Sequence, residues 1–546
     1  MMCFRKITFA FLALCWCGLA ASRAAEYQWS IPVKGARQNG SRAFLWIPPN
    51  CEKVRGVVLA QHNMEEVSIL ENPLFRKNLA ELGFAEIWCA PAFDHLFRFN
   101  EGAGEIFQGM MDALAEESGY AELKVAPIVG LGHSAAASWP YYFAAWNPER
   151  TLAAISVSGQ WPYFRSSMFA PDIWGERNID YVPALETMGE YESASTFSKE
   201  GLKQRQEHPL TPLSMLGAPA EGHFASTDRK AEYLALYLRK AVQYRRPAAE
   251  GDGPAKLKPI DPTKEGWLVD KWRLDDLPAA PAAPVDKYTG DPKQAFWHFD
   301  EEMALATTKY QAAHRGQKAQ LVGYVQNGEI VPQTDSHQQV NLKFQPEADG
   351  VTFKLVGTFL DTVPGGSPRP AKWTGLPAGL PIGHAAGGGP VSIDRICGPF
   401  VKLGPDTFAF RLQRESSPGA GSYDLWFAAT HPGDAQFKPA VQQAQMRVPV
   451  PREGQEQRLT FPEIQEQRVG TKSVPLSASS DAGAKVYFYV REGPAEIQGD
   501  ELVFTQIPPR ARFPVKVTVV AWAPGRGVEP KLKTAVPVER TILLVR

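Results

Sequence analysis

A serine within a short turn of small residues is the side chain of this sequence best suited to covalent chemistry. An apolar run that begins at Val129 continues into Gly132-His-Ser-Ala-Ala, and a predicted helix follows. A strand, a tight turn and a helix around a central serine form a nucleophile elbow, which lifts the hydroxyl clear of a sheet and aims free helical N–H groups at developing negative charge. Ser134 is therefore the candidate nucleophile, with Ala136 where the motif has its second glycine. The alternative is a buried structural serine.

A serine nucleophile needs a general base, which in this arrangement follows both the nucleophile and the acid along the chain. His223 lies in a Glu-Gly-His-Phe segment just before a helix predicted over residues 230–244, so it can reach over the sheet to the elbow. His62 and His133 stand upstream of the nucleophile or within the elbow. We therefore expect His223 to be the base, and His208 is the alternative.

A carboxylate must hold the histidine tautomer and stabilise the imidazolium. The strand predicted over residues 182–188 is followed by Glu190 and Glu192, either of which is suitably placed in the chain. Asp172 and Asp180 are weaker candidates because they precede that strand.

Two hydrogen-bond donors must face the oxyanion of the tetrahedral intermediate. The first is the backbone N–H of Ala135, the residue after the nucleophile. The second is expected in a loop after an early strand, and His62-Asn-Met follows the continuous apolar strand predicted over residues 56–60. We expect the Asn63 N–H to be this donor, with the Met64 N–H as the alternative.

Further side chains close to these positions are candidates for contact with a substrate. Aromatic rings can stack on sugars, although they belong more often to the core or to a pocket rim. Residues 93–101 are expected at the lip of the pocket, and Trp297 and Phe299 are expected to close over the cleft. The candidate contacts are His62, Met64, His133 and Trp161, and the further aromatic candidates are Trp139, Tyr163 and Phe164.

The elements that must position these side chains alternate between strands and helices over residues 27–245. Alternation of this kind predicts an α/β domain with a doubly wound, mostly parallel sheet that helices cover on both faces. The predicted strands are residues 43–47, 56–60, 85–89, 127–131, 152–157 and 182–188, and the predicted helices are residues 74–82, 106–117, from 135 onward, and 230–244.

The second half of the chain differs from the first in its amino-acid composition and in its pattern of predicted elements. Residues 246–291 are rich in proline and alanine, which is typical of a linker arm. Residues 292–455 contain short alternating strands between Gly- and Pro-bearing turns, which predict a β-sandwich. Residues 456–546 predict a separate immunoglobulin-like domain, whose simplest role is that of a structural spacer.

The N-terminus is predicted to be a targeting segment. Arg5 and Lys6 precede an apolar run over residues 7–21 that is too short to cross a bilayer, and small residues follow. Residues 1–25 are therefore predicted to be a signal peptide, and the mature protein is predicted to be exported to the periplasm or beyond the cell. Lipidation at Cys15 or Cys17 is disfavoured because large residues precede both.

Charge and cysteine content narrow the classes of partner. The 58 basic and 59 acidic residues leave a net charge of −1, which offers no electrostatic footprint for nucleic acid. Of the six cysteines, three lie outside the targeting segment, and their spacing is not that of a zinc site. Cys51 and Cys89 are either a disulfide or, together with Cys397, buried thiols.

The elbow, the His-Asn-Met loop and the late Gly-His-Phe segment together resemble the α/β-hydrolase superfamily over residues 40–245. The resemblance implies acyl-enzyme chemistry on a serine without metal or cofactor. In hydrolases of this fold the acid commonly stands three residues after a glycine that ends its strand, here Gly189, and this selects Glu192 over Glu190.

With its appended β-domains, the chain is most similar to exported bacterial carbohydrate esterases. This resemblance implies that the protein removes acetyl, methyl or feruloyl esters from plant polysaccharide. Neither a nucleic-acid partner nor a membrane span is expected. A serine peptidase of the same fold and a non-catalytic glycan-binding protein are the two alternatives.

Overall fold

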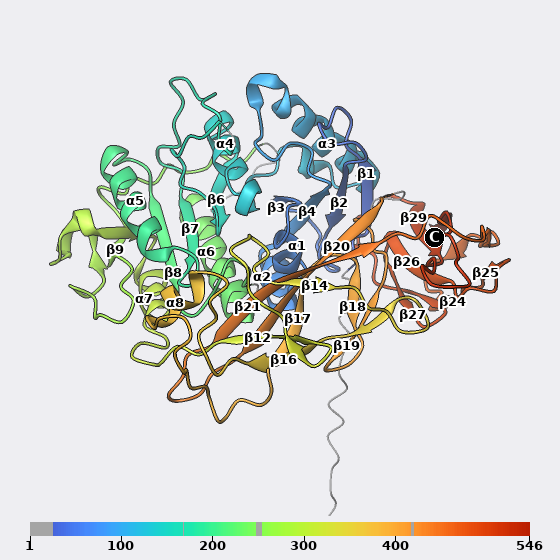
Figure 1. Ribbon diagram of the computed structural model, residues 1–546. Helices are drawn as coiled ribbons and strands as arrows, with labels where there is room; N and C mark the ends of the chain where they lie inside the picture. The colour runs from blue at the N-terminus through green and yellow to red at the C-terminus, as the bar shows by residue number, and fades with distance from the viewer. Residues whose placement is uncertain (1–25, 168, 226, 247–253, 417–419) are drawn as a thin grey trace, which may run out of the picture.

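The computed structural model describes residues 26–167, 169–225, 227–246, 254–416 and 420–546, and residues 1–25, including the predicted signal peptide, lie outside the described part. The first half of the chain is built on an eight-stranded sheet of order β1-β2-β4-β3-β5-β6-β7-β8 (Figure 1). β2 pairs antiparallel with both of its neighbours, whereas all pairs from β4 to β8 are parallel. This is the α/β-hydrolase fold predicted from the sequence. The strands are β1 (Trp29–Pro32), β2 (Arg42–Trp46), β3 (Gly56–Gln61), β4 (Phe84–Ala90), β5 (Ile128–His133), β6 (Thr151–Val157), β7 (Ala184–Gly189) and β8 (Leu213–Ala218).

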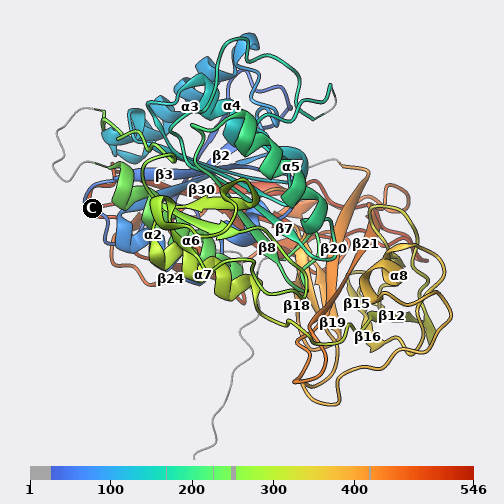
Figure 2. The same ribbon diagram turned by 90° about the vertical axis from the view of Figure 1, so that its left-hand side faces the viewer.

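Helices cover both faces of this sheet, as Figure 2 shows. On β3, Val57 and Leu59 pack into the core beneath α3 and α4, whereas Val58 and Ala60 pack into the core beneath α2 and α6. A strand buried on both faces must be apolar at every position, which explains why this strand is a continuous apolar run. The helices are α1 (Glu66–Leu70), α2 (Pro73–Leu82), α3 (Ala103–Ser118), α4 (Trp139–Trp146), α5 (Ala194–Glu207) and α6 (Asp228–Arg245).

Four elements of this domain carry weak sequence patterns and were not predicted: β1, α1, α5 and β8. The buried positions of α5 are Ala194, Ser198, Gly201 and Leu202, and small residues of this kind produce little apolar periodicity. The helix expected from residue 135 begins only at Trp139, because Ser134–Ala136 form a single 3₁₀ turn.

Residues 254–311 continue this domain rather than leaving it. β9 (Trp267–Asp270), β10 (Ala283–Pro284) and β11 (Ala295–His298) form a small sheet, and α7 (Glu301–Gln311) packs beside α6. Trp297 and Phe299 are buried in the core that contains α6. The expectation that these two rings close over the cleft is therefore wrong, because burial in the core gains more than exposure at a cleft rim.

Residues 318–455, here called the middle β-region, are all-β apart from one short helix. Their strands form three sheets, of orders β14-β21-β20-β17, β15-β19-β18 and β13-β12-β16, around a shared apolar core. The elements are β12 (Val322–Gln326), β13 (Glu329–Ile330), β14 (Asn341–Lys343), β15 (Thr352–Lys354), β16 (Val356–Phe359), α8 (Arg369–Thr374), β17 (Ser392–Cys397), β18 (Phe400–Lys402), β19 (Thr407–Phe410), β20 (Ser422–His431) and β21 (Ala440–Pro449).

Residues 456–546, the C-terminal β-region, pack beside β1 and α3 (Figure 1). The Gly493 N–H donates to the Tyr27 carbonyl (2.9 Å), and the Arg512 N–H donates to the Ser118 carbonyl (2.9 Å). The elements are β22 (Leu459–Thr460), β23 (Gln467–Arg468), β24 (Ser473–Pro475), β25 (Ser479–Ser480), β26 (Tyr487–Glu492), β27 (Ala495–Gln498), β28 (Glu501–Phe504), β29 (Val515–Trp522) and β30 (Val538–Val545).

The cysteines and helices of the described residues bear on the disulfide and membrane-span expectations. Cys51, Cys89 and Cys397 are free and buried, which agrees with three buried thiols rather than a disulfide. Among the helices of the described residues, none combines the length and apolar character needed to cross a membrane.

Buried histidines make the fold sensitive to acid. Burial lowers the pKa of His62 to about 4 and that of His298 to about 3, so both stay neutral in the folded protein where an exposed histidine would be charged. The unfolded chain therefore binds more protons below pH 6.5, and stability is lost as the pH falls from 6.5 toward 4 for His62 and toward 3 for His298. Each histidine is expected to cost about 2 kcal/mol at pH 5 relative to pH 6.5.

The measurement is the thermal unfolding temperature of His298→Gln between pH 7.5 and 4.5. This variant is expected to lose less stability on acidification than the wild type, whereas the same change at exposed His384 leaves the acid response unchanged. Equal acid responses in all three proteins would contradict the prediction.

Candidate active site

The elbow around Ser134 has the backbone geometry that its sequence requires. β5 ends at His133, and Ser134 adopts the left-handed conformation with φ of 53°. A Cβ atom at Gly132 would lie 2.2 Å from the Ala136 carbonyl oxygen, so only glycine fits there. Backbone strain at a non-glycine residue persists only where the surroundings impose it, and here it presents Ser134 at the edge of a cavity.

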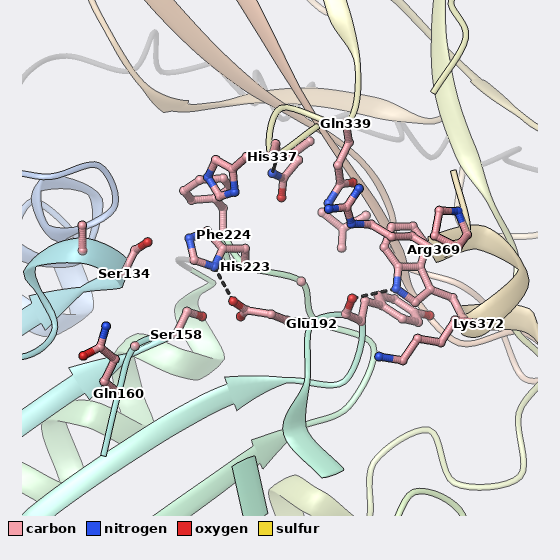
Figure 3. A pocket seen from close by; sticks show the side chains of 18 of the residues that line it. Ser134, Ser158, Gln160, Glu192, His223, Phe224, His337, Gln339, Arg369 and Lys372 are labelled. Atoms are coloured by element: carbon pink, nitrogen blue, oxygen red, sulfur yellow. Dashed lines mark hydrogen bonds and ion pairs between the residues drawn. The ribbon is translucent and has the colours of Figure 1, made fainter. Parts of the chain in front are cut away.

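His223 and Glu192 meet at the same edge of the sheet, after β8 and β7. His223 Nδ1 lies 2.6 Å from Glu192 Oε1, and both side chains are largely buried. Gly189 ends β7 where a Cβ would lie 2.4 Å from the Glu221 carbonyl oxygen, so the loops that carry the two side chains pass closely. Figure 3 shows the Ser134 hydroxyl and the His223 ring facing each other. The buried His223 Nε2 has no hydrogen-bond partner among the described residues, which leaves it able to take a proton.

The other candidate acids and the other candidate base have different partners. Glu190 Oε1 lies 2.5 Å from Lys438 Nζ, and its Oε2 accepts from the Ala220 N–H (2.8 Å). The ring of His208 stacks on Tyr163. Glu190, His208, Asp172 and Asp180 are all absent from the lining of the cavity that contains Ser134.

The backbone N–H of Asn63, expected to be the second oxyanion donor, and that of Met64, its alternative, both donate hydrogen bonds within the protein. The N–H groups of Asn63 and Met64 donate to Glu66 Oε2, at 3.1 and 2.8 Å, and the His133 N–H donates to Glu66 Oε1 (2.9 Å). Glu66 is completely buried, and this burial raises its pKa to about 7. The assignment of Asn63, and of Met64 in its place, is therefore not supported: a buried carboxylate three residues further on takes both donors, whereas Ala135 does line the cavity.

The four candidate substrate contacts also lie behind the cavity wall rather than in it. His133 is fully buried, and its Nε2 lies 3.0 Å from the His223 carbonyl oxygen, so it supports the loop of that histidine. His62 packs edge-on against Trp88, Met64 packs in the cluster around Phe224, and Trp161 stacks on Phe296.

The cavity has a volume of about 580 Å³ and lies between the α/β domain and the middle β-region. The lining residues of the α/β domain follow the carboxyl ends of its parallel strands, where ligands bind in open α/β sheets. These residues are Ser134, Ala135, Ser158, Gly159, Gln160, Phe169, Tyr191, Glu192, Gly222, His223 and Phe224. The middle β-region contributes His337, Gln339, Pro368, Arg369, Lys372, Trp373, Val441 and Gln443.

The lining residues of the α/β domain form one wall of the cavity, and those of the middle β-region form the other. Two polar side chains of the α/β-domain wall have hydrogen-bonding capacity left for a ligand. Ser158 is 3% exposed, has a left-handed φ of 48°, and its hydroxyl lacks a partner among the described residues. Gln160 Oε1 accepts from the Ser138 hydroxyl (2.9 Å), so its amide nitrogen points away from this contact. Neither residue was predicted, because a serine and a glutamine after a strand have no distinctive motif.

The wall formed by the middle β-region is held against the α/β domain by hydrogen bonds and a ring contact. The Tyr191 hydroxyl donates to the Pro439 carbonyl (3.0 Å), and the Trp373 indole N–H donates to the Tyr191 carbonyl (2.6 Å). The ring of His337 lies edge-on to His223, with centroids 5.1 Å apart. Because this wall comes from residues more than 100 positions further along the chain, no local pattern could have associated it with the elbow.

The solved structures named below each cover 40% or less of this chain. No family model and no curated protein matches the chain. Among solved structures, esterase PE8 is 13% identical, with 36% of this chain and 97% of that chain covered and a TM-score of 0.28. Est1E from Butyrivibrio proteoclasticus is 14% identical, with 40% and 98% covered and a TM-score of 0.28. A dienelactone hydrolase from Anabaena variabilis is 18% identical, with 40% and 97% covered and a TM-score of 0.27.

Proposed function

We propose that this protein is a serine ester hydrolase. The observation that carries the proposal is the His223–Glu192 hydrogen bond of 2.6 Å beside an elbow serine. The second ring nitrogen of the histidine has no partner among the residues that the structure describes. A nucleophile, a base and a group that orients the base are the parts that acyl transfer requires.

In the proposed reaction, Ser134 attacks the ester carbonyl while His223 Nε2 accepts the hydroxyl proton. Glu192 accepts the hydrogen bond from Nδ1–H and stabilises the imidazolium without taking the proton. The Ala135 N–H donates to the oxyanion. The imidazolium then protonates the leaving alcohol, and His223 activates a water that releases the acid from the acyl-enzyme.

The proposed substrates are acetyl, methyl or feruloyl esters of plant polysaccharide, hydrolysed outside the cytoplasm. The size of the cavity supports a substrate larger than a simple acetyl ester. Its lining also includes three glutamine side chains, those of Gln160, Gln339 and Gln443. A carboxamide both donates and accepts hydrogen bonds, as recognition of sugar hydroxyls requires.

Covalent labelling tests the identity of the nucleophile directly. A fluorophosphonate is expected to react once per molecule, and peptide mass spectrometry is expected to locate the adduct on Ser134. Prior incubation with an ester substrate should slow the labelling. An adduct on another serine, or an unmodified protein that still hydrolyses esters, would refute the assignment.

A further inference from the structure

We propose that the substrate is an ester of an acidic saccharide, whose carboxylate is bound by Lys372 and Arg369 at the end of the cavity away from Ser134. This inference rests on the proposed function and deepens it, because it selects uronate-bearing glycans from the broader class of polysaccharide esters.

The charged residues that line the cavity favour an anionic substrate. Glu192 is the sole acidic residue among the lining residues of the described chain, and its carboxylate is hydrogen-bonded to His223. Arg369 and Lys372 line the opposite wall. Cations on the wall of a cleft raise the local concentration of an anionic substrate and favour its binding.

Both cations have hydrogen-bonding capacity left for a ligand. The Lys372 ammonium has no ion pair or hydrogen bond with any described residue. Arg369 makes its side-chain contacts through Nη1, which lies 3.2 Å from both Asp335 Oδ1 and the Ser336 carbonyl oxygen. These contacts tether the loop that carries His337 and Gln339. Because Asp335 is exposed and outside the cavity lining, it neutralises the guanidinium only weakly.

The two cations lie away from the proposed nucleophile. Figure 3 shows Arg369 and Lys372 beyond Glu192 as seen from Ser134. A carboxylate bound there is not the ester that reacts, so it belongs to another part of the same substrate molecule. In an oligosaccharide this part is a neighbouring sugar.

Two glutamine side chains of the same wall also have polar groups left for a ligand. The Gln443 side-chain nitrogen donates to the His337 carbonyl (2.5 Å), and Gln339 Oε1 accepts from Gln442 (2.7 Å). The Gln443 oxygen and the Gln339 nitrogen remain as an acceptor and a donor facing the same space. One acceptor, one donor and a pair of cations match sugar hydroxyls beside a carboxylate.

The test compares kcat/KM for acetylated galacturonate oligosaccharides, acetylated xylo-oligosaccharides and p-nitrophenyl acetate. The wild type is expected to prefer the acidic oligosaccharide over the neutral one, and high salt is expected to reduce this preference. Lys372→Gln is expected to lower kcat/KM for the acidic oligosaccharide about five- to ten-fold through KM, with little effect on the two neutral substrates. Lys354→Gln, an exposed lysine of β15 outside the cavity, is the matched control and should change none of the three values.

A fourth substrate, the p-nitrophenyl monoester of succinic acid, tests whether the cations recognise any carboxylate or only one on a neighbouring sugar. This ester is expected to show no dependence on Lys372, because its carboxylate lies too close to the reacting carbonyl. An equal effect of Lys372→Gln on acidic and neutral oligosaccharides, or no preference in the wild type, would overturn the inference. Failure of the proposed function gives a different result: no turnover of p-nitrophenyl acetate and no labelling of Ser134.

Discussion

Replacing Ser134 with alanine is expected to lower kcat for p-nitrophenyl acetate by roughly 10⁴- to 10⁶-fold, because in the proposed mechanism its hydroxyl oxygen forms the acyl-enzyme. The thermal unfolding temperature should stay close to that of the wild type. Alanine keeps the Cβ and has the same difficulty with the left-handed φ at this position, so the change removes a nucleophile without adding backbone strain.

Ser158→Ala is the matched control for this experiment. Ser158 is also a serine with a positive φ whose side chain lines the cavity, but it follows β6 rather than β5. If it contacts the substrate through one hydrogen bond, its loss should lower kcat/KM about ten-fold or less. Substantial turnover by Ser134→Ala, measured with a protein preparation free of other esterases, would end the proposal of a serine nucleophile.

Glu192→Gln is expected to lower kcat by about 10³- to 10⁴-fold. The amide has the same shape as the carboxylate, but it cannot stabilise an imidazolium and can hold His223 in the wrong tautomer. Labelling of Ser134 by a fluorophosphonate should slow in parallel, because both reactions need the base. The measurement is kcat at a pH of about 8 together with the rate of labelling.

Glu190→Gln tests whether the loss of activity expected for Glu192→Gln is specific to the proposed catalytic acid or follows from removing any nearby carboxylate. Glu190 and Lys438 are both less than a tenth exposed and form an ion pair between the α/β domain and the middle β-region. Removing one charge leaves the other buried and uncompensated, at a cost of about 3 kcal/mol, so the thermal unfolding temperature should fall by roughly 5 °C or more. Activity per folded molecule should stay within a few-fold of the wild type. The reverse pattern, with Glu190→Gln inactive and Glu192→Gln active, would transfer the role to Glu190.

Part of the candidate site could be predicted because it depends on local chain geometry. The elbow needs small residues at fixed positions around Ser134, since the backbone of Ala136 passes too close to Gly132 for any side chain. The parallel sheet could be predicted for a similar reason, because strands buried on both faces, such as β3, are apolar throughout. Elements whose buried positions are small, such as α5, have no such pattern and were missed.

The loop expected to supply the second oxyanion donor is a place where the local sequence pattern led to a wrong prediction. Asn63 and Met64 follow the expected strand, yet Glu66 accepts hydrogen bonds from both of their amides. A glutamate at the start of a short helix is ordinarily an exposed residue. Its burial here depends on the packing of α1 against β5, which is a contact between segments more than 60 residues apart.

The sequence by itself determined the strained turn that presents Ser134 and the alternation that builds a parallel sheet, since each of these depends on neighbouring residues. It also predicted Ser134, Glu192 and His223 as nucleophile, acid and base. The tertiary structure alone decided which glutamate lies beside His223 and that the Asn63 and Met64 amides donate to Glu66. It also decided that Arg369 and Lys372 of the middle β-region line the same cavity as Ser134. The physical reason is that partner choice, burial and charge at this site arise where the carboxyl ends of the strands meet a domain that begins more than 100 residues after the elbow. Contacts between residues so far apart in the chain cannot be predicted from the local spacing of the residues that make them.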